Sequence, residues 1–160
     1  MGCVISNVLN GRWPRGVMPV VLDKGFTPAL RSAITAAIAH WNDPTKGMPV
    51  RIVPHKHEPD YVRFTNNPIP DLGGPTTNTH ESSASQFLGR HHGMQLIFCG
   101  EGADLGNLVH EIGHAFGLAH EQNREDRFQS VDIHWDNIPL EERSQFSQDH
   151  HGTDDAGAYD

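Results

Sequence analysis

His110 to His120 read H-E-I-G-H-A-F-G-L-A-H. This stretch is the part of the sequence that most strongly indicates the structure of the chain. Two histidines stand four residues apart, a glycine follows three residues after the second, and a third histidine follows three residues after the glycine. Because an α-helix turns by about 100° per residue, His110 and His114 would lie within roughly 40° of each other. The spacing therefore predicts two imidazoles on one face of a helix.

We expect residues 104 to 117 to form this helix. Its apolar residues recur at i, i+3, i+4, i+7 and i+11, a pattern typical of a helix with one face in a core. They are Leu105, Leu108, Val109, Ile112 and Phe116. The first two histidines lie opposite this stripe, and Glu111 lies beside them. Gly117 can end the helix in a left-handed turn, which would bring His120 back toward the same point.

Three neutral imidazoles with an open fourth position are typical of a catalytic zinc site rather than a structural one. We therefore expect one catalytic Zn²⁺ on His110, His114 and His120. Glu111 would act as the general base toward a metal-activated water. The alternative is a surface helix that carries histidines by chance, because the chain has 12 of them. Five fixed positions within eleven residues, on an amphipathic helix, favour the metal site.

The sequence after the motif narrows the choice of protein family that the chain resembles. The run from His120 to Arg127 has the form H-E-x-x-R-x-D-R, and Val131 to Ile138 continue as V-x-I-x-x-x-N-I. The extended histidine motif marks one group of zinc proteases, and together with this continuation it resembles the astacin family of metzincin endopeptidases. The resemblance covers about residues 12 to 160. Its upstream parts are Trp13-Pro14, Gly16-Val17-x-Pro19, Ala37-Ile38-x-x-Trp41 and Pro59-Asp60-Tyr61-Val62-Arg63-Phe64.

The resemblance implies an α+β fold, in which a metzincin-like N-terminal subdomain has a twisted mixed sheet of about five strands, a backing helix and the zinc-binding helix. It implies a zinc-dependent endopeptidase that binds a polypeptide in extended form beside an antiparallel edge strand at residues 84 to 88. Members of the family are usually secreted, so we expect an extracellular protein, although no signal peptide is recognisable. Residues 1 to 11 are interpreted as an N-terminal arm and residues 12 to 160 as the catalytic domain.

The end of the chain departs from the family pattern. Metzincins have a methionine turn below the zinc, which in astacins usually follows a Y-D-Y stretch. The sequence stops at Ala158-Tyr159-Asp160, where this turn would begin, and Met18, Met48 and Met94 all precede the zinc motif. A second hypothesis is therefore a zinc-binding but catalytically silent fragment or interaction module. The presence of Glu111 favours the enzyme.

Composition bears on the other classes of function. The net charge of −8 argues against nucleic acid or an anionic membrane as the main partner, and no apolar run is long enough to span a bilayer. A chain of 160 residues suffices for one domain with a real core, and we expect a monomer. The first six residues, M-G-C-V-I-S, fit a myristoylation pattern. They give a third hypothesis, a lipid-anchored intracellular protein.

Local patterns predict the remaining elements. Strands are expected at residues 17–22, 50–53, 61–65, 84–88 and 94–99. Pro19 would place the first of these at a sheet edge or a bulge. Thr27-Pro28 starts a helix whose apolar residues recur as far as Trp41. Residues 66 to 82 are expected to be a surface loop, and Leu140 to Asp149 a short helix.

The two cysteines, Cys3 and Cys99, permit at most one internal disulfide. Cys3 could pair with Cys99, remain free, or cap the zinc as a thiolate. The resemblance implies a cysteine at Cys99 whose usual partner, near residues 78 to 85, is missing here. We expect a free thiol.

Overall fold

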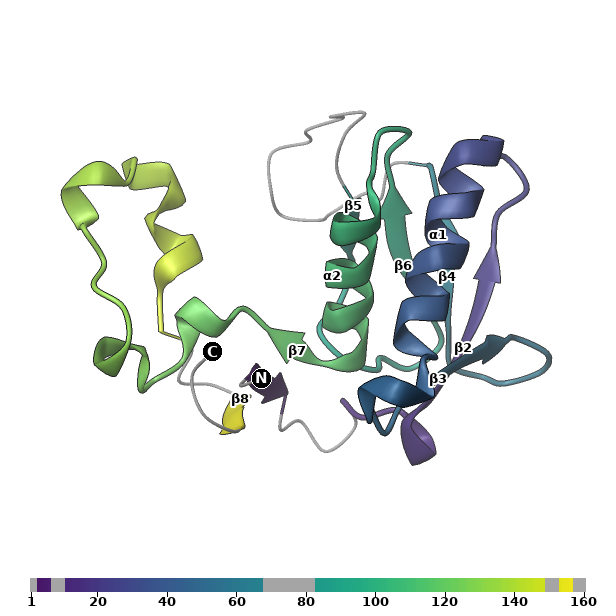
Figure 1. Ribbon diagram of the computed structural model, residues 1–160, viewed down its shortest axis with the longest axis horizontal. Helices are drawn as coiled ribbons and strands as arrows, with labels where there is room; N and C mark the ends of the chain where they lie inside the picture. The colour runs from purple at the N-terminus through teal and green to yellow at the C-terminus, as the bar shows by residue number, and fades with distance from the viewer. Residues whose placement is uncertain (1–2, 7–10, 68–82, 149–152, 157–160) are drawn as a thin grey trace.

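The computed structural model describes residues 3–6, 11–67, 83–148 and 153–156, and it is organised around a five-stranded sheet (Figure 1). The strands are β2 (Val17–Leu22), β3 (Arg51–Pro54), β4 (Tyr61–Thr65), β5 (Ser83–Ser85) and β6 (Met94–Cys99). They lie in the order β3-β2-β4-β6-β5. The first four run parallel, and β5 pairs antiparallel with β6 at one edge. The predicted α+β class and mixed sheet are confirmed.

Two helices, α1 (Pro28–Trp41) and α2 (Leu105–Phe116), pack on the sheet, and the predicted cap at Thr27 and the predicted glycine turn at Gly117 are present. The Thr27 hydroxyl accepts a hydrogen bond from the Leu30 N–H at 3.3 Å. At the start of α2, the Asp104 carboxylate accepts from the Asn107 N–H, and the Asn107 side chain accepts from the Asp104 N–H. This reciprocal capping box and the terminal Gly117 explain why α2 is one residue shorter at each end than predicted.

Both helices lie side by side against one face of the sheet (Figure 1), and the core fills the space between them. Fully buried side chains come from β2, β4 and β6 and from both helices: Met18, Val62, Phe64, Ile97, Ile34, Leu108 and Ile112. Leu105 departs from the predicted apolar stripe, because it is 46% exposed. It is the first residue of α2 and precedes the turn at which Leu108 enters the core.

Contrary to the expectation from Pro19, β2 is not an edge strand but lies between β3 and β4. The Val20 carbonyl accepts from the His55 N–H at 2.8 Å, so the backbone groups of Val20 face β3. Because these groups alternate along a parallel strand, those of Pro19 face the β4 side. The pairing with β4 begins only at Val20, so the missing N–H of Pro19 interrupts no ladder bond.

The interpretation of residues 1 to 11 as an arm missed a strand. A second sheet has the order β7-β1-β8, in which β1 (Cys3–Ser6) pairs antiparallel with β7 (Leu118–Ala119) and β8 (Thr153–Ala156). Such short segments show no periodicity, so only their tertiary pairing defines them. Of the expected loop at 66 to 82, residues 68–82 lie outside the described part of the chain.

Short 3₁₀ segments make up the remaining helical structure. Two of them, η1 (Pro14–Gly16) and η2 (Pro44–Lys46), flank β2 and α1. The others lie beside the helix–sheet body in Figure 1: η3 (Glu121–Asn123), η4 (Arg127–Gln129), η5 (Trp135–Asn137) and η6 (Leu140–Phe146). The short helix predicted from Leu140 is thus 3₁₀ and ends at Phe146. No helix in the described ranges has the length and apolar character needed to cross a bilayer.

Distant residues hold α2 through its backbone carbonyls. The Trp13 indole N–H donates to the Ala115 carbonyl at 2.8 Å, and the Gly89 N–H donates to the His114 carbonyl at 2.8 Å. Both acceptors belong to the last turn, where carbonyls have no donor four residues on within the helix, and the His114 carbonyl also accepts from the Gly117 N–H of the cap. The Trp41 indole N–H also donates to the Val109 carbonyl, at 3.1 Å. Residues from α1, from the segment before β2 and from the β5–β6 connection therefore fix α2.

Cys99, at the end of β6, is a free and fully buried thiol, as expected. Burial raises its pKa to about 12, and the nearby carboxylate of Glu111 adds to the effect. The native protein therefore keeps the thiol protonated far above neutral pH, which makes it a poor nucleophile.

We expect Trp13→Phe to lower the free energy of unfolding by about 1–3 kcal/mol, because the Ala115 carbonyl would remain buried without its donor while an aromatic ring still fills the site. Urea denaturation followed by far-ultraviolet circular dichroism measures this change. Trp135→Phe is the matched control, since Trp135 is 40% exposed. Equal midpoints for Trp13→Phe and the wild type would contradict the assigned role.

In a Cys3→Ser chain, where Cys99 is the only thiol, we expect a chromogenic aryl disulfide reagent at pH 8 to react only after denaturation. The folded pKa of about 12 lies above the ordinary value of 9.0, so the native state retains the proton between these two pH values while the unfolded state releases it. The contribution of Cys99 to stability is therefore complete below pH 9 and falls as pH rises toward 12. Rapid reaction of the native chain would show that Cys99 is accessible.

Candidate metal centre

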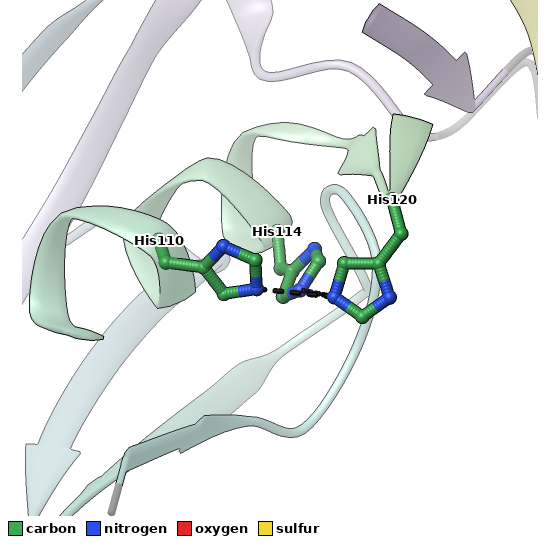
Figure 2. A group of neighbouring side chains, drawn as sticks. All are labelled: His110, His114 and His120. Atoms are coloured by element: carbon green, nitrogen blue, oxygen red, sulfur yellow. Dashed lines mark hydrogen bonds between the residues drawn. The ribbon is translucent and has the colours of Figure 1, made fainter. Parts of the chain in front are cut away.

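Three histidine side chains converge at the end of α2 (Figure 2). His110 and His114 come from adjacent turns of the helix, and Gly117, with φ 103°, reverses the chain through the left-handed region that glycine tolerates. The reversal brings His120 back against them. The His120 Nε2 atom lies 3.1 Å from the Nε2 atoms of both His110 and His114.

The donor set fits a metal ion. In a tetrahedral zinc site with Zn–N bonds of about 2.0–2.1 Å, two ligand nitrogens lie roughly 3.4 Å apart, close to the separation of 3.1 Å found here. Within the part of the chain that the structure describes, this is the one group of three or more His, Cys, Asp or Glu side chains with converging ligand atoms. All three histidines also line a cavity, and a catalytic zinc site needs such room for a fourth ligand.

The tautomer of His114 is fixed by its second nitrogen. The Nδ1 atom lies 2.6 Å from the Leu118 carbonyl oxygen, which can only accept a hydrogen bond. Nδ1 therefore carries the proton and Nε2 presents its lone pair to the other two imidazoles. This is the outer-shell orientation found for most metal-bound histidines.

The surroundings also favour neutral imidazoles. Burial lowers the pKa of His110, and the neighbouring His114 lowers it further, while Glu111 opposes both. Burial likewise lowers the pKa of His120, with added effects from His114 and His110. A neutral imidazole has a free lone pair, so these shifts favour the form that binds a metal.

Glu111 lies on the side of α2 that faces the edge strand β5. Its Oε2 atom accepts a hydrogen bond from the backbone N–H of Ser85 at 2.7 Å. Burial raises the pKa of Glu111, whereas the Ser85 N–H and His110 oppose the shift. The motif placed Glu111 beside the histidines, but the sequence carries no signal for Ser85, because any residue except proline provides a backbone N–H.

A cavity of about 660 Å³ opens beside the imidazoles. The histidines form one wall with Val109, Gly113 and Leu118, and the opposite wall comes from the end of α1 and the chain after it: His40, Trp41, Lys46 and Met48. This second wall was not predicted, because the contact between α1 and α2 is a tertiary feature. The two helices pack closely there, since a Cβ atom at Gly113 would come into van der Waals contact with the Trp41 ring, at 3.4 Å.

The charged turn after His120 is held together by its own arginines. Arg124 is only 1% exposed and donates two hydrogen bonds of 2.8 Å to the Asp126 carboxylate, with Glu121 at 3.6 Å. Arg127 donates to the backbone carbonyls of Gln122 and Phe146. These bonds fix the chain as it leaves the histidine cluster.

Comparison with known proteins agrees with this geometry. The family model for Astacin, a peptidase family, matches residues 6–160. The chain is 33% identical to human Tolloid-like protein 1 over 128 residues, which cover 79% of this chain and 11% of that protein. It is 32% identical to bone morphogenetic protein 1 of Xenopus laevis over 128 residues, covering 79% and 16%. The chain thus spans less than a fifth of the length of these relatives.

One solved structure is similar to this chain in both fold and sequence. High choriolytic enzyme 1, a hatching enzyme zinc-protease of medaka (Oryzias latipes), superposes with a TM-score of 0.66 and 26% identity. The superposition covers 92% of this chain and 64% of that one. Myroilysin, at 19% identity and a TM-score of 0.53, shares the fold. The family match over most of the chain confirms the resemblance seen in the motifs, and the chain belongs to the astacin family of peptidases.

Proposed function

We propose that residues 12–160 form a zinc-dependent endopeptidase domain with His110, His114 and His120 as the metal ligands and Glu111 as the general base. The observation that carries this proposal is the convergence of three Nε2 atoms next to a partly buried carboxylate. Membership of a family of zinc metalloproteases supports the same conclusion.

The chemistry divides between the ion and the side chains. Zinc, when bound, lowers the pKa of a water ligand toward about 7 and polarises the carbonyl of the scissile bond. The Glu111 carboxylate takes a proton from the attacking water and then gives it to the leaving amine. Its raised pKa suits this role, because a base works best when its pKa lies near the working pH.

The proposed substrate is a polypeptide in extended form. β5 is the outer strand of the sheet, so the backbone groups on its free side can pair with a peptide added as a further strand. Peptide pairing there would hold the substrate within reach of Glu111, which contacts the same strand. We further propose that the protein is secreted, as the family resemblance implies, and that it is a monomer.

A zinc-binding interaction module without catalytic activity is the second candidate. Three large apolar side chains beyond the histidine cluster favour it, because they are accessible to a protein partner. Phe128 is 74% exposed, Leu140 78% and Trp135 40%. Both candidates bind zinc, so the Glu111 experiment below separates them.

We expect the purified chain to bind one zinc ion, measured by plasma mass spectrometry. Addition of 1,10-phenanthroline should then lower the melting temperature, because zinc stabilises only the folded state. His120→Ala should weaken zinc binding by more than about tenfold, a loss that even outer-shell substitutions can cause. His57→Ala is the control, since His57 is exposed and lies outside the cluster. Equal zinc affinity of the two variants would exclude His120 as a ligand.

We expect Glu111→Gln to retain one zinc ion while peptide hydrolysis falls by about 10²–10⁴-fold, because the amide cannot accept the proton. Cleavage of a casein or fluorogenic peptide substrate measures the rate. Glu141→Gln, an exposed carboxylate, is the control. Full activity in Glu111→Gln would remove the role assigned to Glu111, and zinc binding without cleavage in the wild type would favour the interaction module.

A further inference from the structure

The general base has a partner outside its own helix. Glu111 and Ser85 are 26 residues apart in the chain, yet the Ser85 N–H donates to Glu111 Oε2 at 2.7 Å. A backbone amide bound to a carboxylate at this distance is a charge-assisted hydrogen bond, stronger than one between neutral groups. The edge of the sheet therefore contacts the base directly.

The register of β5 explains why this amide is available. The next residue, Gln86, donates its N–H to the Leu96 carbonyl at 2.9 Å, so the backbone groups of Gln86 face β6. Backbone groups alternate along an antiparallel strand, and those of Ser85 therefore face the free edge. An edge amide is ordinarily open to water or to another strand. Here it is directed at α2 and occupied by Glu111.

Hydrogen bonds hold the segment around this amide against both β6 and α2. The Gln86 side-chain oxygen accepts from the Leu96 N–H at 3.0 Å, which continues the contact between β5 and β6 beyond the last paired residue. The Ser85 hydroxyl donates to the Phe87 carbonyl at 3.0 Å. Four residues after Ser85, the Gly89 N–H donates to the His114 carbonyl of α2. The amide thus stands at a fixed distance from the helix that carries Glu111.

We propose that the backbone N–H of Ser85 is a positioning group for Glu111, and that β5 serves both as the peptide-binding edge and as the support of the general base. This inference rests on the proposed endopeptidase function. The bond holds Oε2 and restricts rotation of the flexible glutamate side chain, so Oε1 becomes the proton acceptor. A substrate strand that pairs with β5 meets the Ser85 carbonyl as an acceptor, while the Ser85 N–H stays with Glu111.

Proline at position 85 removes the amide donor, and an edge strand tolerates proline on its free side. We compare Ser85→Pro with Ser85→Ala, which keeps the N–H and loses the hydroxyl. We expect kcat of Ser85→Pro to be about 10–10²-fold below that of Ser85→Ala, because misplacement of a catalytic group by about 1 Å costs about that much. KM and zinc content should agree within about threefold. Equal kcat values in the two variants would overturn the proposal.

Amide hydrogen exchange tests the bond without any reliance on catalysis or on the folding of the proline variant. In the full chain, we expect the Ser85 N–H to exchange at least about tenfold faster in Glu111→Ala than in the wild type, while the Gln86 N–H, which is bonded to β6, keeps its rate. Equal exchange of Ser85 in both proteins would show that Glu111 does not hold this amide, and would overturn the proposal. If the wild type cleaves no peptide but the Ser85 protection is present, the proposed function fails while the contact stands.

Discussion

The placement of α2 depends on hydrogen bonds to its own carbonyl groups from residues far away in the chain. Trp13 donates to the Ala115 carbonyl, and Gly89 donates to the His114 carbonyl, which also accepts from the Gly117 N–H of the helix cap. Both carbonyls lie in the last turn, where no donor four residues on is left within the helix. The same turn carries the second histidine of the cluster. The bonds that satisfy the helix end therefore also fix the histidine cluster, and a change in the segment before β2 or in the β5–β6 connection acts on the imidazoles through the backbone.

His120 needs a separate support because it lies outside the helix. Gly117 turns the chain, and the Leu118 carbonyl meets His114 Nδ1, so the reversal that delivers the third imidazole also orients the second. Beyond His120, the buried Arg124 ties the following turn together through Asp126. The three histidines are thus preorganised by two local structures, the helix end and the charged turn, which meet where the imidazoles converge.

The features that the sequence predicts well are those encoded within a few residues. The glycine turn that ends α2, most of its apolar face and the spacing of the three histidines are local, and the structure has them where they were expected. What escaped prediction depends on long-range pairing. The position of β2 inside the sheet follows from the register of β3 and β4 around Pro19, and β1 exists through its pairing with β7 and β8. No local pattern contains this information.

The hydrogen bond between Ser85 and Glu111 is the clearest example of a contact that no local sequence pattern predicts. A motif records side chains, whereas this donor is a backbone N–H whose direction is set by the alternation of β5 against β6. Replacing Ser85 by most other residues would leave the backbone N–H donor in place. The amino acid at position 85 can therefore change, and no sequence motif would record the need for this donor. The requirement that remains is geometric: β5 must keep its register, and residue 85 must not be proline. A functional constraint can therefore act on the edge of a sheet without prescribing the amino acids along it.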